Sequence, residues 1–414
     1  MTDIRPFKAF RPIKEHAHQI AALPYDVYNR QEAKAIVNQN PLSFLAIDRA
    51  ETAFGEDVDT YADQVYAKAK ELLDQRTKEG YFVQDIEACY YLYELSMDGR
   101  SQMGIVGCAS IDDYLNNVIK KHENTRADKE LDRIRHVDTC DAQTGPIFLA
   151  YREQEELKQL KRGWVQTHTP EVDFVSEDGV GHRIWKIDDP EVIAQFKAVM
   201  SNLPGVYIAD GHHRCASAVR VGIMRREQEA NYTGEEEFNF FLSVLFPDEE
   251  LMIMDYNRVV KDLNGYTEEE FLEKVSKQFE VTKLGAYPVK PNCKGQFGMY
   301  LGGEWYVLVA KPEIQSKDPV KGLDVSVLQD NLLAPILGIQ DPKTDKRIDF
   351  VGGIRGLQEL ERRANSDMKV AFSMYPTSIA ELFSVADAGL LMPPKSTWFE
   401  PKLRSGFFVH KLTD

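Results

Sequence analysis

The residues best suited to chemistry lie in one stretch, which runs from Val206 to Ala218. Its first four residues, Val206–Ala209, are apolar or small and predict a buried strand. A turn follows, and its residues are Asp210, Gly211, His212, His213 and Arg214. Apolar residues recur after the turn, so the last three turn residues should open a helix. The sequence therefore predicts a strand-to-helix corner that carries a carboxylate, two imidazoles and a guanidinium.

Such a corner suits a phosphate group. The N-terminus of a helix presents unpaired backbone N–H groups and a partial positive charge, and it attracts anions. Gly211 carries no Cβ and lets the backbone approach a ligand closely. Arg214 adds a planar fork that matches phosphate oxygens. We therefore predict that Gly211, His212, His213 and Arg214 bind the phosphates of a nucleotide.

Other interpretations of this corner stay open. Asp210 could be a helix N-cap, which needs no function, and the histidines could be surface residues of an ordinary helix. A metal site is a third interpretation. Adjacent residues on a helix point roughly 100° apart, so His212 and His213 cannot easily bind one ion. Metal chemistry therefore ranks below phosphate binding.

A second stretch, Lys120–Arg135, concentrates positive charge in an otherwise acidic protein and indicates an anion nearby. It contains His122 and Glu123. A carboxylate beside bound phosphate can accept the proton of an attacking hydroxyl, which is the base role in phosphoryl transfer. Glu123 is the preferred candidate. The alternative is a solvated helix face with ion pairs four residues apart, which the residues Lys129–Arg133 fit well.

A third basic stretch lies near the C-terminus, where Lys395, Ser396 and Thr397 precede Lys402 and Arg404. Prolines and glycine keep this stretch in a loop. Hydroxyl and ammonium groups together suit phosphate or adenine-nucleotide contact, so we predict that the first three residues bind nucleotide. A basic tail that packs on an acidic body explains the pattern equally well.

Composition limits the class of protein. The 414 residues are 43% hydrophobic and 28% charged, as in a globular protein, and the net charge is −16. This charge opposes binding of nucleic acid or of an anionic membrane. The five cysteines form no Cys-x-x-Cys pair, which favours a reducing compartment without structural zinc. With no secretory signal and no apolar run of about 20 residues, we expect a cytoplasmic protein.

Helix and strand patterns alternate along the chain and predict a mixed α+β or α/β fold. Cys89–Leu95 and Met103–Ala109 should pair around the turn Asp98-Gly99. A second hairpin is expected between Phe240–Phe246 and Leu251–Asp255.

These residues resemble the bacterial domain-of-unknown-function family 1015, and the resemblance runs almost end to end. The stretches that carry it are Leu23–Val27, Asn40–Phe44, His122–Thr125, Lys129–Arg133, Gly145–Phe148, Tyr207–Ala218 and Met392–Phe407. The middle portion in turn is similar to the ParB/sulfiredoxin superfamily, which includes free-serine kinases. In those kinases a His-Glu motif precedes an Asp-Gly-His-x-Arg turn, and both motifs occur here in that order.

The resemblance implies a ParB/sulfiredoxin-like nucleotide-binding core at 116–260, with α/β segments at 1–115 and 261–414. It implies a kinase that makes O-phosphoserine from L-serine with ATP or ADP. His122, Glu123 and Asp210 would be catalytic, with Glu123 as base and Asp210 reaching Mg²⁺. As a separate inference, Arg126 or Arg133 could hold the substrate carboxylate by a bidentate pair.

Two further functions stay open, because a family analogy does not fix a substrate. One is a ParB-like switch that binds nucleotide without phosphorylating a small molecule. The other, weaker option is a metal-dependent hydrolase built on His122, Glu123, Asp210 and His212. The sequence also leaves open whether the chain forms a homodimer.

Overall fold

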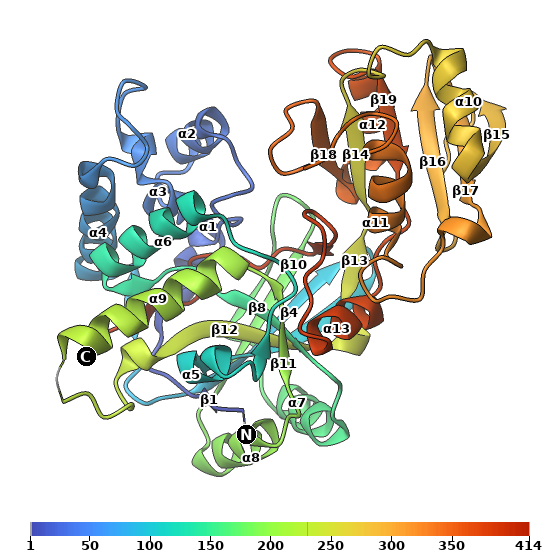
Figure 1. Ribbon diagram of the computed structural model, residues 1–414. Helices are drawn as coiled ribbons and strands as arrows, with labels where there is room; N and C mark the ends of the chain where they lie inside the picture. The colour runs from blue at the N-terminus through green and yellow to red at the C-terminus, as the bar shows by residue number, and fades with distance from the viewer. Residues whose placement is uncertain (1, 230, 414) are drawn as a thin grey trace. The chain divides into compact units, whose positions relative to one another are not determined.

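A computed structural model describes residues 2–229 and 231–413 of the chain (Figure 1). The chain divides into two compact units. Unit 1 comprises Met1–Leu251 together with Pro401–Asp414, and unit 2 comprises Met252–Glu400. Both units mix helices and strands, so the predicted mixed α/β class is confirmed.

Unit 1 is built on a mixed sheet with the strand order β6-β11-β8-β12-β5-β4-β10-β9, and β1 pairs with β5. In chain order these strands are β1 (Ile4–Arg5), β4 (Tyr90–Met97), β5 (Arg100–Ser110), β6 (Ile119–Lys120), β8 (Ile147–Tyr151), β9 (Val172–Val175), β10 (Gly181–Ile187), β11 (Val206–Asp210) and β12 (Phe240–Pro247). Unit 1 also contains two short antiparallel pairs of strands. In one, β2 (Phe10–Pro12) pairs with β3 (Phe82–Gln84), and in the other, β7 (Ala142–Gln143) pairs with β21 (His410–Lys411).

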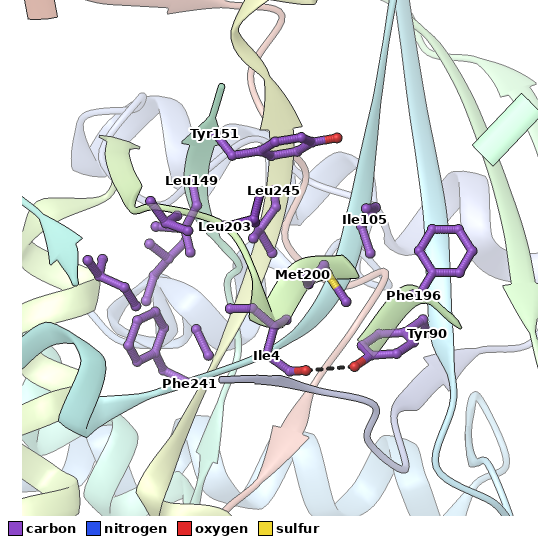
Figure 2. Packing of buried hydrophobic residues seen from close by; sticks show 14 of the residues in the cluster. Ile4, Tyr90, Ile105, Leu149, Tyr151, Phe196, Met200, Leu203, Phe241 and Leu245 are labelled. Atoms are coloured by element: carbon purple, nitrogen blue, oxygen red, sulfur yellow. Dashed lines mark hydrogen bonds between the residues drawn. The ribbon is translucent and has the colours of Figure 1, made fainter. Parts of the chain in front are cut away.

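Helices and the sheet share the core of unit 1. The helices are α1 (Ala17–Ile20), α2 (Arg30–Gln39), α3 (Leu45–Asp48), α4 (Asp63–Lys78), α5 (Ile111–Leu115), α6 (Ala127–Cys140), α7 (Glu155–Thr167), α8 (Pro190–Ser201) and α9 (His212–Gln228). Trp164 of α7, Phe196 of α8 and Cys215 of α9 are buried with the apolar residues of the strands. Figure 2 shows part of this core, in which the Tyr90 hydroxyl donates to the Ile4 carbonyl at 2.6 Å.

Local turn chemistry explains the first predicted hairpin. Strands β4 and β5 pair antiparallel from Tyr91 opposite Val106 to Met97 opposite Arg100. Asp98 and Gly99, between them, both have positive φ, at 51° and 76°. Asp-Gly is a favoured pair for this geometry because its twist matches that of the flanking strands. The prediction around Asp98-Gly99 is confirmed.

The second predicted hairpin is wrong. Strand β12 pairs with β5 and β8 in unit 1. The residues after it, Asp248–Glu250, form a 3₁₀ turn, and β13 (Met252–Met254) pairs with β20 (Trp398–Glu400) in unit 2. The fully buried β12 gains partners on both of its edges within the central sheet. Pairing with distant strands therefore overrides the local turn signal.

Unit 2 contains a second sheet, with the order β15-β17-β16-β19-β14-β18. Its strands are β14 (Tyr256–Val260), β15 (Phe279–Gly285), β16 (Gln296–Leu301), β17 (Glu304–Ala310), β18 (Ile348–Gly352) and β19 (Val370–Ser373). Its helices are α10 (Glu268–Gln278), α11 (Asp324–Leu328), α12 (Gly356–Ala364) and α13 (Ile379–Asp387). Trp305, Leu360 and Val351 are among the residues of its apolar core.

The three segments expected from sequence, 1–115, 116–260 and 261–414, stay a prediction. Strands β4 and β5 of the first segment and β8, β11 and β12 of the second lie in one sheet. Every helix in the described residues is too short or too polar to span a bilayer.

A buried histidine makes the stability of unit 1 sensitive to acid. His182 of β10 is fully buried, and its ring contacts the Tyr93 hydroxyl at 2.9 Å and the Ser176 hydroxyl at 3.0 Å. Arg404 lies 3.4 Å from its Nε2, and Asp178 pairs with Arg404. Burial and the charge of Arg404 lower the pKa of His182 to about 3.

We expect this histidine to destabilise the fold as pH falls. In the unfolded chain the His182 imidazole takes up a proton near pH 6.5, whereas in the folded chain it does so only near pH 3. The free energy of unfolding therefore falls as the pH drops from 6.5 toward 3. The loss from His182 alone is about 3 kcal/mol between pH 6.5 and pH 4. Urea unfolding of wild type and His182→Gln across this range checks it, because the variant should lose less stability on acidification. Parallel curves for the two proteins would contradict the assignment.

Candidate functional site

The sheet explains why the two motifs of unit 1 meet. Strands β6 and β11 are parallel neighbours, with Ile119 opposite Val206 and Lys120 opposite Tyr207. The carboxyl ends of parallel strands lie at the same edge of a sheet. His122 and Glu123 follow the end of β6, and the predicted turn follows the end of β11, so both motifs lie at one edge.

The turn itself forms the predicted strand-to-helix corner. Gly211 is the N-cap of α9 and has a φ of 91°, which favours glycine. A Cβ at this position would lie 3.1 Å from Nε and Nη2 of Arg214, tighter than nearly all Cβ contacts. Because the cap residue is Gly211 and no side chain caps this helix, the alternative in which Asp210 is the N-cap is wrong.

His122, Glu123 and His212 converge at this edge. Each offers a nitrogen or carboxylate oxygen, and these atoms all lie within 4.8 Å of one another. The rings of His122 and His212 are 4.5 Å apart, edge to face, and both are buried. Burial lowers the pKa of His122 to about 4 and holds the pKa of His212 well below its usual value. Both imidazoles are therefore neutral near pH 7.

Asp210 lies between two cations. Lys402 donates to its Oδ2 at 3.3 Å, and Nη2 of Arg214 lies 3.8 Å from the same oxygen. Burial raises the pKa of Asp210, but Lys402 and Arg214 outweigh it and hold that pKa well below its ordinary value. The carboxylate is therefore charged at neutral pH. Lys402 belongs to the predicted basic stretch near the C-terminus but was not among the residues predicted to bind nucleotide.

Arg214 is held against the loop before β8. Its Nη1 donates to the Pro146 carbonyl, and a Cβ on Gly145 would lie 3.6 Å from the same nitrogen. Little of the Arg214 side chain is exposed. The guanidinium is therefore fixed at the corner and reaches toward Asp210.

The predicted substrate arginines have different environments. The backbone N–H of Arg126 donates to Nε2 of His213 at 2.9 Å, while its exposed side chain pairs with Asp128 at 2.8 Å. Arg133 is buried, and its guanidinium pairs with Asp132 at 2.9 Å and lies 4.1 Å from the ring centre of Tyr25. The roles of both arginines in binding a substrate stay predictions.

Lys395, Ser396 and Thr397 lie in unit 2. The Lys395 carbonyl accepts from Nη2 of Arg258 at 3.0 Å, and the Ser396 hydroxyl donates to the Pro393 carbonyl at 2.7 Å. Their predicted contact with nucleotide stays a prediction.

The edge of unit 1 thus combines two kinds of group. The N-terminus of α9, Arg214 and Lys402 supply positive charge and N–H donors for an anion. Glu123, among two neutral imidazoles, supplies a carboxylate that can take up a proton or bind a metal ion. Such a set can bind a phosphorylated molecule beside a general base.

Solved structures with a distant likeness to the chain were found. A mutant form of a free serine kinase in complex with ADP shares 14% identity with a TM-score of 0.35, over 72% of this chain and 87% of that one. A conserved hypothetical protein from Pyrococcus furiosus shares 14% identity with a TM-score of 0.34, over 74% and 94%. C-terminally truncated SbnI from Staphylococcus aureus shares 11% identity with a TM-score of 0.38, over 71% and 82%. No curated protein matches the sequence.

The match to a protein family is more extensive. Residues 4–326 match the family described as "Protein of unknown function (DUF1015)". This span includes the His122–Glu123 pair and the whole corner from β11 to α9. It covers more than half of the chain, and the chain therefore belongs to the DUF1015 family.

Proposed function

We propose that this chain is a small-molecule kinase that converts free L-serine to O-phospho-L-serine, with ATP or ADP as the phosphoryl donor. The corner between β11 and α9 would hold the donor's phosphates. The sequence resemblance to free-serine kinases, carried by the His-Glu motif and the Asp-Gly-His-x-Arg turn, supports serine as the acceptor.

The proposed reaction moves one phosphoryl group and one proton. The hydroxyl oxygen of serine attacks the terminal phosphorus, and the bond from that phosphorus to the bridging oxygen breaks. The proton of the hydroxyl passes to the carboxylate of Glu123, and the nucleotide leaves with one phosphate fewer. Arg214 and Lys402 would offset the negative charge on the phosphoryl oxygens.

One observation carries the proposal. A ligand atom of Glu123 lies within 4.8 Å of one on His212, the first residue of α9. A phosphate bound at this helix N-terminus would therefore be next to the candidate base. General-base catalysis requires the base within hydrogen-bond reach of the hydroxyl that it deprotonates.

Mg²⁺ fits this site in part. Asp210 offers a charged carboxylate, the hard oxygen ligand that Mg²⁺ prefers, and Mg²⁺ commonly binds one carboxylate together with substrate phosphates. When bound with the nucleotide, the ion would supply further charge neutralisation at the phosphates. Lys402 and Arg214 already partner Asp210, so this chain provides charge neutralisation of its own.

Phosphorus NMR tests the proposal. The full-length protein is incubated with L-serine and either Mg-ATP or Mg-ADP, and the products are followed over time. We expect the resonance of O-phosphoserine to grow as the terminal phosphate of one donor is consumed. Nucleotide that is bound without any turnover would instead indicate a ParB-like switch.

A second candidate function is a metal-dependent hydrolase, and the cluster of His122, Glu123 and His212 favours it. Two histidines and one glutamate are a donor set of catalytic zinc sites. Nε2 of His212 is buried and has no hydrogen-bond partner among the described residues. Asp210, the fourth residue of the predicted hydrolase, pairs with Lys402 and is not in this cluster.

The metal dependence of the activity separates the two candidate functions. A kinase should keep its activity with Mg²⁺ after transition metals have been removed by chelation. A hydrolase should lose its activity on chelation and regain it with Zn²⁺ or Mn²⁺, without any nucleotide. Activity with Mg²⁺ after chelation would support Glu123 as a base, and activity that returns only with Zn²⁺ or Mn²⁺ would support Glu123 as a metal ligand.

A further inference from the structure

Three side chains at the candidate site form a set of metal-ion ligands. His122 and Glu123 lie between β6 and α6, and His212 is the first residue of α9. Each offers one nitrogen or carboxylate oxygen, and these atoms all lie within 4.8 Å of one another. In a tetrahedral zinc site, bonds of about 2.0–2.2 Å place neighbouring ligand atoms about 3.4 Å apart. Rotation of the three side chains would therefore bring their atoms within reach of one ion.

His212 is the member of this set that points most directly to a ligand. It is 8% exposed, and its Nε2 is buried without a hydrogen-bond partner among the described residues. Buried polar atoms in folded proteins are nearly always paired, so an exception requires an explanation. An ion bound through this nitrogen would supply the missing partner.

The two imidazoles have the protonation state that metal binding needs. A histidine binds a metal ion only in its neutral form. Burial lowers the pKa of His122 to about 4 and holds the pKa of His212 well below its usual value. The charge of Asp210 acts in the opposite direction on both rings, so its field favours a cation at the cluster. The cluster can therefore bind an ion at neutral pH without first losing a proton from either ring.

The donor atoms favour Zn²⁺ over Mg²⁺. Mg²⁺ prefers oxygen ligands in an octahedron, whereas Zn²⁺ binds imidazole nitrogen and carboxylate oxygen in a tetrahedron. Two imidazoles, one carboxylate and an open fourth position match Zn²⁺. The Mg²⁺ of the nucleotide would bind at Asp210, which is not in the cluster. The two ions would therefore not compete for protein ligands.

We propose that His122, Glu123 and His212 bind Zn²⁺ and that the bound ion inhibits the kinase. A Glu123 oxygen that binds the ion cannot at the same time accept the proton of the serine hydroxyl. The active kinase would therefore carry no transition metal at this cluster. The inhibition rests on the proposed function, whereas the binding of the ion does not. This role differs from that in the hydrolase candidate, in which the same ion would activate a water molecule.

Metal binding is tested first, on the full-length protein after chelation. Co²⁺ serves as a spectroscopic substitute for Zn²⁺, because four-coordinate Co²⁺ absorbs visible light strongly and six-coordinate Co²⁺ only weakly. We expect strong bands when Co²⁺ is added and loss of these bands when Zn²⁺ displaces it. A weak six-coordinate spectrum, or no binding of either ion, would overturn the metal site.

Variants then assign the ligands. His212→Gln and Glu123→Gln should each raise the Kd for Zn²⁺ more than about 100-fold, beyond the 10- to 100-fold loss typical of residues that only orient a ligand. Glu123 is only partly buried, so its variant gives the answer if His212→Gln does not fold. His18→Gln, at an exposed histidine of α1, is the matched control and should keep the Kd of the wild type. Wild-type affinity in both cluster variants would show that Zn²⁺ binds elsewhere.

Inhibition is tested by phosphorus NMR with L-serine, Mg-ATP or Mg-ADP, and a buffered concentration of free Zn²⁺. The rate of phosphoserine formation should fall in proportion to the fraction of protein that has bound Zn²⁺, and it should recover on chelation. His18→Gln should be inhibited as the wild type is. An undiminished rate in the Zn²⁺-saturated protein would contradict the inhibitory role, as would a hydrolase activity that appears when Zn²⁺ binds.

The metal site and the kinase can fail independently. If the cluster binds Zn²⁺ but the metal-free protein forms no phosphoserine with either nucleotide, the metal site stands and the kinase proposal fails. If phosphoserine forms and neither Co²⁺ nor Zn²⁺ binds at the cluster, the kinase proposal stands and the metal site fails.

Discussion

Glu123→Gln should lower kcat for phosphoserine formation about 10²- to 10⁴-fold, the usual contribution of a general base. Glutamine has nearly the same shape but cannot accept the proton of the serine hydroxyl at neutral pH. The Kd for the nucleotide should change by less than about twofold, because the phosphate groups are assigned to Arg214, Lys402 and the N-terminus of α9. Initial rates and titration calorimetry on the same preparation measure the two quantities.

The matched control for this prediction is Glu71→Gln, because Glu71 is an exposed glutamate on α4. It should keep the rate and the nucleotide affinity of the wild type. Full activity in Glu123→Gln would exclude the base role. A loss of bound transition metal together with activity would instead support the hydrolase.

Lys402→Ala should weaken nucleotide binding about 10- to 100-fold, the range expected for a lost charged hydrogen bond. Two effects add in this variant. A cation for the phosphates is lost, and the Asp210 carboxylate loses the partner that donates to it at 3.3 Å. Asp210 then repels the phosphates. Calorimetric titration with Mg-ADP and Mg-ATP checks the loss.

A double variant separates these two effects. Lys402→Ala combined with Asp210→Asn removes the repulsion and should recover part of the lost affinity, so the two changes are not additive. Lys402→Arg keeps the positive charge and should stay closer to the wild type than Lys402→Ala. Unchanged nucleotide affinity in Lys402→Ala would show that the phosphates bind elsewhere.

Local sequence was sufficient to predict the corner. The apolar run of β11, the positive φ of Gly211 and the periodicity of α9 all follow from neighbouring residues. The same holds for the turn at Asp98-Gly99. These elements could be predicted because backbone propensity and side-chain pattern favour the same structure in each of them.

Contacts between distant parts of the chain could not be predicted. β12 pairs with β5 and β8, which the turn after Phe246 does not indicate. Lys402 reaches Asp210 across 192 positions of sequence. Such partners become visible only when the sheet and the C-terminal residues are placed together.

The location of the phosphates is the claim on which the account depends most. A crystal structure of the wild-type protein with ADP and O-phosphoserine tests it most directly. The account predicts a phosphate within hydrogen-bond distance of the first backbone N–H groups of α9, of Arg214 and of Lys402, with the serine oxygen next to Glu123. Nucleotide phosphates bound away from this corner, or a metal ion held by His122, Glu123 and His212 with no phosphate nearby, would contradict it.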